Sequence, residues 1–152
     1  MSLLKKIFGQ NEAVSKEIEG LGVFTFYKDS VDSYWKIEKP VGSLPEGFDF
    51  GTIDGDENSP NKEAQDVFTR LANYPEEVNS LLGPSFFSKL PEALGFNSLN
   101  DIESKLFLKS LTCTSANHFE FGFHSREGDI FVEAFCRSGE ITEVHVDEGC
   151  CD

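Results

Sequence analysis

The sequence predicts a single α+β domain in which two central helices cover one face of an antiparallel sheet. Three observations predict this class. Strand-like segments form a hairpin in the N-terminal part, helical periodicity is confined to the middle, and the last third is a meander of consecutive strands. Since helices and strands are segregated, the pattern favours α+β over an alternating α/β architecture. We expect residues 1–152 to form one domain, because this length is sufficient for one hydrophobic core.

A short amphipathic helix is expected at residues 2–9. Its apolar side chains recur at helical spacing, and two adjacent lysines lie on the other side. One or two turns are too little for stable membrane anchoring, so docking onto the domain is the expected role. The segment lacks the features of a signal peptide, and the chain has no apolar run of the roughly 20 residues that a membrane span needs. We therefore expect a cytoplasmic protein with reduced thiols.

A hairpin is predicted before the helices. Residues 22–27 are rich in strand formers, and residues 28–33 have the composition of a turn. Residues 34–38 return as the partner strand, which Pro40 ends. Residues 48–54 give a third strand candidate, so this part of the chain contributes two or three strands.

Two helices are predicted in the middle of the chain. Ser59 is the expected N-cap of the first, and Pro60 follows at the first helical position, where its missing N–H costs nothing. The buried face of this helix follows a 3.6-residue period through Ala64, Val67, Phe68 and Leu71. A second helix is expected to begin at Pro75 and to break near Pro84.

The C-terminal meander consists of four predicted strands, at residues 106–113, 118–124, 130–136 and 141–146. If the connection after the second strand holds three residues, large apolar side chains gather on one face: Phe119, Phe121, Phe123, Phe131, Phe135, Val144 and Val146. A one-residue change in this connection instead aligns the first three phenylalanines with Val132, Ala134 and Cys136. We favour the aromatic register because it places the large apolar groups together.

The opposite face of the meander is mixed in the favoured register. It carries Glu120, His124, Glu143 and His145 beside the small residues Gly122 and Ala134. Such a face is either partly covered or available to a partner.

The chain is strongly acidic. Its net charge is -14, from 27 acidic and 13 basic residues, which disfavours direct binding to nucleic acid or to anionic membranes. Seven carboxylates lie within residues 46–66 beside one lysine, and five lie within residues 140–152 with no lysine or arginine. We expect these two blocks to form a negative surface for a protein partner with a basic surface. The alternative is that the charge only keeps the protein soluble.

Candidate partner-binding residues come from the acidic blocks and from nearby aromatic side chains. The acidic candidates are Asp49, Asp54, Asp56, Glu57, Glu143 and Asp147. Tyr34 and Trp35 are the candidate anchors, because exposed aromatic side chains contribute strongly to binding interfaces.

Metal binding is the competing interpretation. Residues 118–152 contain all three histidines and three of the four cysteines. His124, His145 and Cys136 are the candidate ligands of a small metal-dependent enzyme or sensor. Zinc sites usually present their ligands as closely spaced pairs, and no such pair is present, so we expect no cofactor.

Other signatures of site chemistry are weak or absent. Residues 54–58 resemble the start of a calcium-binding loop, but Ser59 and Gln65 stand where that loop has glycine and glutamate. The sequence contains no nucleophile elbow, no phosphate-binding glycine loop and no dinucleotide fingerprint. No catalytic residue is therefore assigned.

The order of the segments resembles that of small bacterial α+β proteins of unknown function, which include immunity proteins of polymorphic toxin systems. The residues that carry the resemblance lie within about 19–147: Gly20–Phe26, Tyr34–Ile37, Ile53–Asp56, the Ser59-Pro60 pair and the terminal meander. The resemblance implies a non-enzymatic protein that binds and blocks a cognate toxin in the cytoplasm. A structural or oligomerising domain that uses an exposed strand edge is a third interpretation.

Overall fold

A computed structural model describes residues 14–42, 44, 46–73, 77, 82, 84–90, 95–96, 98–128 and 130–148. The helix expected at residues 2–9 and most of the second predicted helix, from Pro75 onward, lie outside the described residues. None of the helices in the described ranges is long and apolar enough to cross a membrane.

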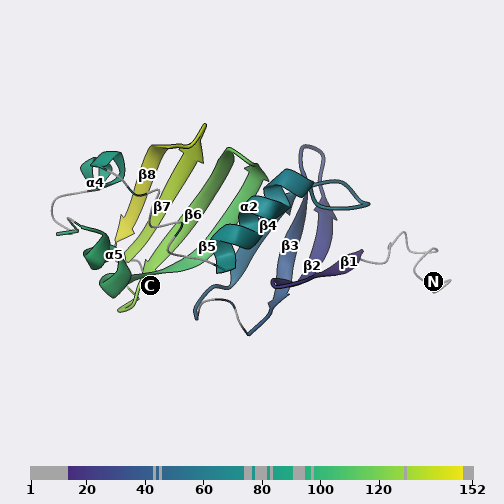
Figure 1. Ribbon diagram of the computed structural model, residues 1–152, viewed down its shortest axis with the longest axis horizontal. Coiled ribbons are helices and arrows are strands. Elements are labelled where there is room, and N and C mark those ends of the chain that lie inside the picture. Colours follow the sequence, from purple (N-terminus) through teal and green to yellow (C-terminus); the bar gives the residue numbers. More distant parts are fainter. Residues whose placement is uncertain are drawn as a thin grey trace.

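Eight strands form one sheet, and the helices that the structure describes come between the fourth and the fifth strand in the sequence (Figure 1). The strands are β1 (Ser15–Ile18), β2 (Gly22–Lys28), β3 (Ser33–Pro40), β4 (Phe50–Asp54), β5 (Leu106–Ser115), β6 (His118–Ser125), β7 (Ile130–Arg137) and β8 (Glu140–Glu148). The helices are α2 (Lys62–Asn73), α4 (Pro84–Lys89) and α5 (Leu99–Lys105). The α+β class with a mostly antiparallel sheet is therefore confirmed.

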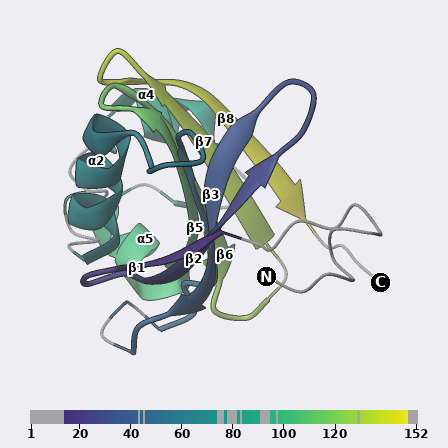
Figure 2. The ribbon, with the colours of Figure 1, turned by 90° about the vertical axis from the view of Figure 1, so that its right-hand side faces the viewer.

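The strands lie side by side in chain order, and every neighbouring pair is antiparallel except β4 and β5. This parallel pair fuses the N-terminal strands and the C-terminal meander into one mixed sheet. A parallel pair needs a long crossover connection, and here residues 55–105 supply it; its described part includes α2, α4 and α5. Figure 2 shows these helices on one side of the sheet. We call that side the inner face and the opposite side the outer face.

Phe68 of α2 is the centre of the contact between helix and sheet. Its ring is fully buried and meets the rings of Phe24 and Phe48 edge to face, with centroid distances of 5.7 and 6.0 Å. Gly51 of β4 lies beneath it, and a Cβ atom there would come within 2.4 Å of the Phe68 ring. The absence of a side chain at Gly51 therefore lets α2 pack closely on the sheet.

Gly51→Ala is expected to lower the free energy of unfolding by about 1–3 kcal/mol, because Phe68 must move out of a well-packed position. Gly42→Ala is the matched control, since a Cβ atom at Gly42 meets nothing within 4 Å. We expect it to change stability by less than about 0.5 kcal/mol. Urea unfolding followed by circular dichroism measures both, and equal stabilities would contradict the contact between Phe68 and β4.

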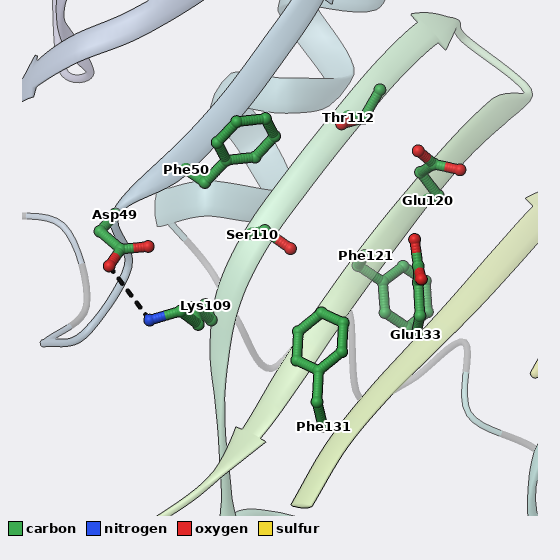
Figure 3. Close-up of a pocket in the computed structure, with 9 residues that line it drawn as sticks. All are labelled: Asp49, Phe50, Lys109, Ser110, Thr112, Glu120, Phe121, Phe131 and Glu133. Carbon is green, nitrogen blue, oxygen red and sulfur yellow. Dashed lines mark hydrogen bonds and ion pairs between the residues drawn. The ribbon is translucent and has the colours of Figure 1, made fainter. Parts of the chain in front are cut away.

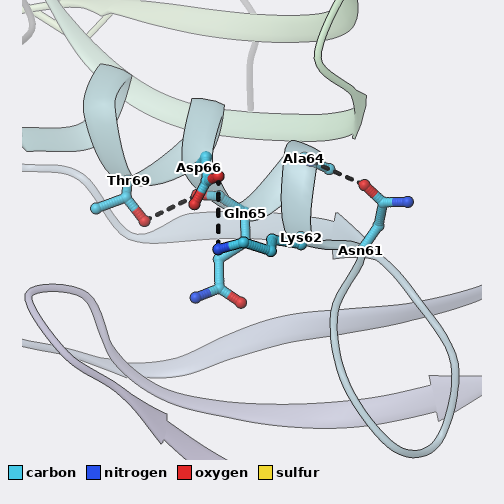
Figure 4. A network of polar contacts seen from close by, with 6 residues as sticks. All are labelled: Asn61, Lys62, Ala64, Gln65, Asp66 and Thr69. Carbon is cyan, nitrogen blue, oxygen red and sulfur yellow. Dashed lines mark hydrogen bonds and ion pairs between the residues drawn. The ribbon is translucent and has the colours of Figure 1, made fainter.

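The start of α2 differs from the prediction. Its N-cap is Asn61, whose side-chain oxygen accepts the N–H of Ala64 at 2.9 Å (Figure 4), and not Ser59. The reason is that Pro60 pairs with Gly55, and the Asn61 N–H donates to the carbonyl of Asp54. These contacts close the loop before α2, so the helix begins two residues later than predicted.

Helix α5 was not predicted, although a local signal for it exists. The hydroxyl of its N-cap, Ser98, accepts the N–H of Asp101. A serine followed three residues later by an acidic residue is a known start signal for helices. Helix α4 begins at Pro84, which matches the expected break at that residue.

The favoured register of the meander is wrong. In the structure Phe119 lies opposite Cys136, Phe121 opposite Ala134 and Phe123 opposite Val132, so the alternative register is the one adopted. Val144 and Val146 lie opposite Ala134 and Val132, on the inner face as expected. Phe131 and Phe135 consequently lie on the outer face, where they pair with His124 and Glu120.

Packing explains this register. Three phenylalanines of β6 are buried on the inner face, so the smaller side chains of β7 fit opposite them. On the outer face, Gly122 leaves room for the ring of Phe131, because a Cβ atom at Gly122 would lie 2.9 Å from that ring. The turn between β6 and β7 fixes the offset of the two strands, since the buried hydroxyl of Ser125 accepts the N–H groups of both Gly128 and Ile130.

Candidate functional site

The outer face brings together five of the predicted binding residues from distant parts of the chain. Tyr34 and Asp54 pair with each other across β3 and β4. Glu143 and Asp147 lie on β8, opposite the outer-face residues Phe135 and Phe131. Asp49 lies at the rim just before β4 and forms an ion pair with Lys109 at 3.1 Å. These residues lie on or beside β3, β4 and β8, so they define a broad face that extends from β3 to β8.

Trp35 does not belong to this face, and its prediction as an exposed anchor is corrected. It is 0% exposed on the inner face, beside the ring of Phe26 at 5.4 Å. Its indole N–H donates to the carbonyl oxygen of Asp56 at 2.9 Å. The alternation of β3 explains this position, because Tyr34 and Lys36 on either side of Trp35 point to the outer face.

The loop between β4 and α2 holds the other two predicted acidic residues. The Asp56 carboxylate accepts the N–H groups of Asn58 and Ser59 at 2.9 and 3.1 Å, so it stabilises its own loop. Glu57 is exposed beside it. In the described part of the chain, no three His, Cys, Asp or Glu side chains are grouped to hold a metal ion, in this loop or elsewhere.

The structure does not bring the alternative metal ligands together. His124 lies on β6 and His145 on β8, so β7 separates them by about 10 Å at the usual strand spacing. Cys136 faces the opposite way, into the core, where it is buried. Burial raises the pKa of the Cys136 thiol and of the buried Cys113 thiol. Both thiols are therefore protonated packing groups at neutral pH.

A hollow on the outer face was not predicted from the sequence. It has a volume of about 430 Å³, which is within the range of small-ligand sites. Figure 3 shows the rings of Phe50 and Phe131 on either side of Ser110, with two carboxylates at one side of the hollow. Those carboxylates belong to Glu120 of β6 and Glu133 of β7.

Another hollow on the outer face adjoins the first, and we call it the second hollow. It has a volume of about 470 Å³ and shares Phe50, Thr112 and Glu120 with the first hollow. Between them, the hydroxyl of Thr52 donates to that of Thr112 at 3.1 Å, which satisfies both polar groups. We call the two hollows together the outer trough. It runs from β3 to β7 across the junction of the two halves of the sheet.

Carboxyl groups in the outer trough are held in an unfavourable environment for charge. Burial, followed by the negative charge of Glu133, raises the pKa of Glu120, whereas His118 and Arg137 act in the opposite sense. Burial, followed by the charge of Asp32, raises the pKa of Asp54. A positive group bound in the trough would therefore stabilise the ionised form of both carboxyl groups.

Aromatic side chains accompany these carboxylates. Phe50 and Tyr27 are each 41% exposed, which is unusual for large apolar rings. Tyr27 stacks on Tyr34 with a centroid distance of 5.8 Å, and its hydroxyl donates to the Glu38 carboxylate at 2.6 Å. No local pattern indicates that Tyr27, Phe50 and Phe131 share a face, because their strands are far apart in the chain.

The chain matches no protein-family model, no curated protein and no solved structure in the comparisons with known proteins. Its class is an α+β protein with an eight-stranded mixed sheet, helices on the inner face, and an acidic, aromatic outer face.

Proposed function

We propose that the protein is a non-enzymatic binding module whose outer face recognises a protein partner with a basic surface. The observation that carries the proposal is the outer trough, where exposed aromatic rings and carboxylates from both halves of the sheet occur together. Aromatic side chains are common anchors of protein interfaces, and complementary charge accelerates association and selects the partner. An immunity-type inhibitor of a basic toxin in the cytoplasm fits this description.

The position of β8 favours a basic partner over a second copy of the chain. This strand forms one edge of the sheet, and its outer-face side chains include Glu143 and Asp147. Two copies that paired through β8 would bring like charges together, which is unfavourable in cross-strand pairs. A partner that carries lysine or arginine would instead form opposite-charge pairs there.

Reversing charge on the outer face is expected to abolish partner capture. In the outer-face variant, Asp54, Glu143 and Asp147 all become lysine. Each reversal adds two units of charge, so the net charge changes from -14 to -8. We expect at least about a tenfold slower association with the partner and a weaker dependence on salt, because electrostatic steering is lost.

The matched control carries the same change in net charge elsewhere. Glu19, Glu63 and Asp66 are exposed residues at or near α2, on the inner-face side, and all three become lysine. Tagged wild-type protein and both variants are used to capture proteins from the native cytoplasm, and salt-eluted proteins are identified by mass spectrometry. The proposal predicts a basic protein that the wild type and the control retain and the outer-face variant loses. Equal retention by all three proteins would refute the assignment to the outer face.

A further inference from the structure

We propose that the hollow between Phe50 and Phe131 receives an arginine side chain of the protein partner. This inference rests on the proposed function, and it assigns one residue type of the partner to one place on the outer face. The hollow combines three properties that a guanidinium group requires: flat aromatic walls, carboxylates at one side, and hydroxyl groups between them.

The two glutamates at one side of the hollow, Glu120 and Glu133, have no paired cation among the residues that the structure describes. Lys109 lines the hollow, but its ammonium group is paired with Asp49 at the rim. The ionised carboxylates therefore offer acceptors to a positive group from outside the chain.

Charged side chains of β6 and β7 act on Glu120. Burial, followed by the negative charge of Glu133 on β7, raises the pKa of Glu120, while His118 on β6 and Arg137 on β7 act in the opposite sense. A guanidinium group in the hollow would add a second positive charge close to both glutamates. Binding is consequently expected to strengthen as pH rises and Glu120 ionises.

The aromatic walls favour arginine over lysine. A planar guanidinium stacks on an aromatic ring and forms two hydrogen bonds with a carboxylate, whereas an ammonium group is a compact and strongly hydrated charge. Phe50 already makes one cation–π contact. On the side of the second hollow, the ammonium nitrogen of Lys36 lies 5.7 Å from the centroid of the Phe50 ring. The other aromatic wall is the ring of Phe131. Its position depends on Gly122, because a side chain at Gly122 would displace this ring.

The experiment titrates capped arginine, N-acetyl-arginine amide, into the ¹⁵N-labelled full chain and follows the amide signals by NMR. Capped citrulline is the neutral control of nearly the same shape, and capped lysine tests the role of the guanidinium. We expect saturable shifts at Ser110, Gly122 and Glu133 with capped arginine, at a roughly millimolar dissociation constant for so small a ligand. Capped citrulline should give none, and capped lysine should bind more weakly.

A double variant, Glu120→Gln with Glu133→Gln, is expected to weaken the binding of capped arginine by about tenfold or more, because charge-assisted hydrogen bonds are lost. Glu19→Gln with Glu63→Gln, which makes the same change in charge on the inner-face side, is the control that should leave it unchanged. The proposal is overturned if capped arginine gives no saturable shifts, if capped citrulline or lysine binds equally well, or if the double variant binds as the wild type does.

The two proposals fail in different ways. If capped arginine does not bind but the outer-face variant still loses the partner, the arginine pocket is refuted and the binding function stands. If capped arginine binds in the hollow while charge reversal leaves partner capture unchanged, the function assigned to the outer face is refuted. The arginine assignment then falls with it, because the occupant would not be a side chain of a partner on that face.

Discussion

Trp35→Ala is expected to lower the free energy of unfolding by about 3–5 kcal/mol, the usual cost of deleting a large buried aromatic side chain. Trp35 is fully buried, packs on Phe26, and donates its indole N–H to the loop that leads into α2. The substitution removes this packing and also leaves the carbonyl of Asp56 without its donor. Urea unfolding must be followed by circular dichroism, since Trp35 is the only tryptophan of the chain.

Tyr34→Ala is the control on the neighbouring residue. Its ring lies on the outer face and stacks on Tyr27, so we expect a loss of about 1–1.5 kcal/mol. The two variants compare the loss of unfolding free energy on deleting a core side chain and a surface side chain at adjacent positions of β3. A Trp35→Ala protein with unchanged stability and impaired partner binding would contradict the structure and restore Trp35 as an anchor.

Ala134→Glu is expected to cost about 3–5 kcal/mol or to prevent folding, because it places an uncompensated charge in the core. Ala134 is fully buried on the inner face, between Phe121 of β6 and Val144 of β8. The adjacent substitution, Phe135→Glu, places the same carboxylate on the outer face. We expect that variant to fold, with a smaller loss from the contact between Phe135 and the ring of His145.

This pair tests the register of the meander directly. In the register favoured by the sequence the outcomes would be reversed, because Phe135 would face the core and Ala134 the outer side. Thermal unfolding of the two purified variants, compared with the wild type, measures the difference. A more stable Ala134→Glu protein than Phe135→Glu protein would refute the register of the structure.

Local patterns were sufficient for most of the elements, although β1 and α5 were not predicted. Alternation and β-branched or aromatic composition identified the strands of the hairpin and the meander, and a 3.6-residue period identified α2. These signals depend on neighbours a few residues apart, which the sequence contains in full. Helix starts were less secure, because Asn61 became the cap of α2 only after the loop closed between Gly55 and Pro60.

The candidate site was predictable only in part. Asp54, Glu143 and Asp147 were named from charge alone and do lie on the outer face. Phe50, Phe131 and Glu133 were not assigned to a site, because their joint position depends on two pairings: the parallel alignment of β4 with β5 and the offset of β6 against β7. Trp35 was misplaced because a strand that is aromatic at successive positions does not indicate which residue is buried.

The sequence by itself determined the class of the fold, the positions of most strands, the first central helix and the acidic character of the surface. The tertiary structure decided the register of the meander, the junction between the two halves of the sheet and the composition of the outer trough. The physical reason is that hydrophobic alternation specifies two faces without specifying which residues of the next strand lie opposite. That choice follows from how side-chain volumes fill the inner face of the sheet and how Ser125 fixes the turn.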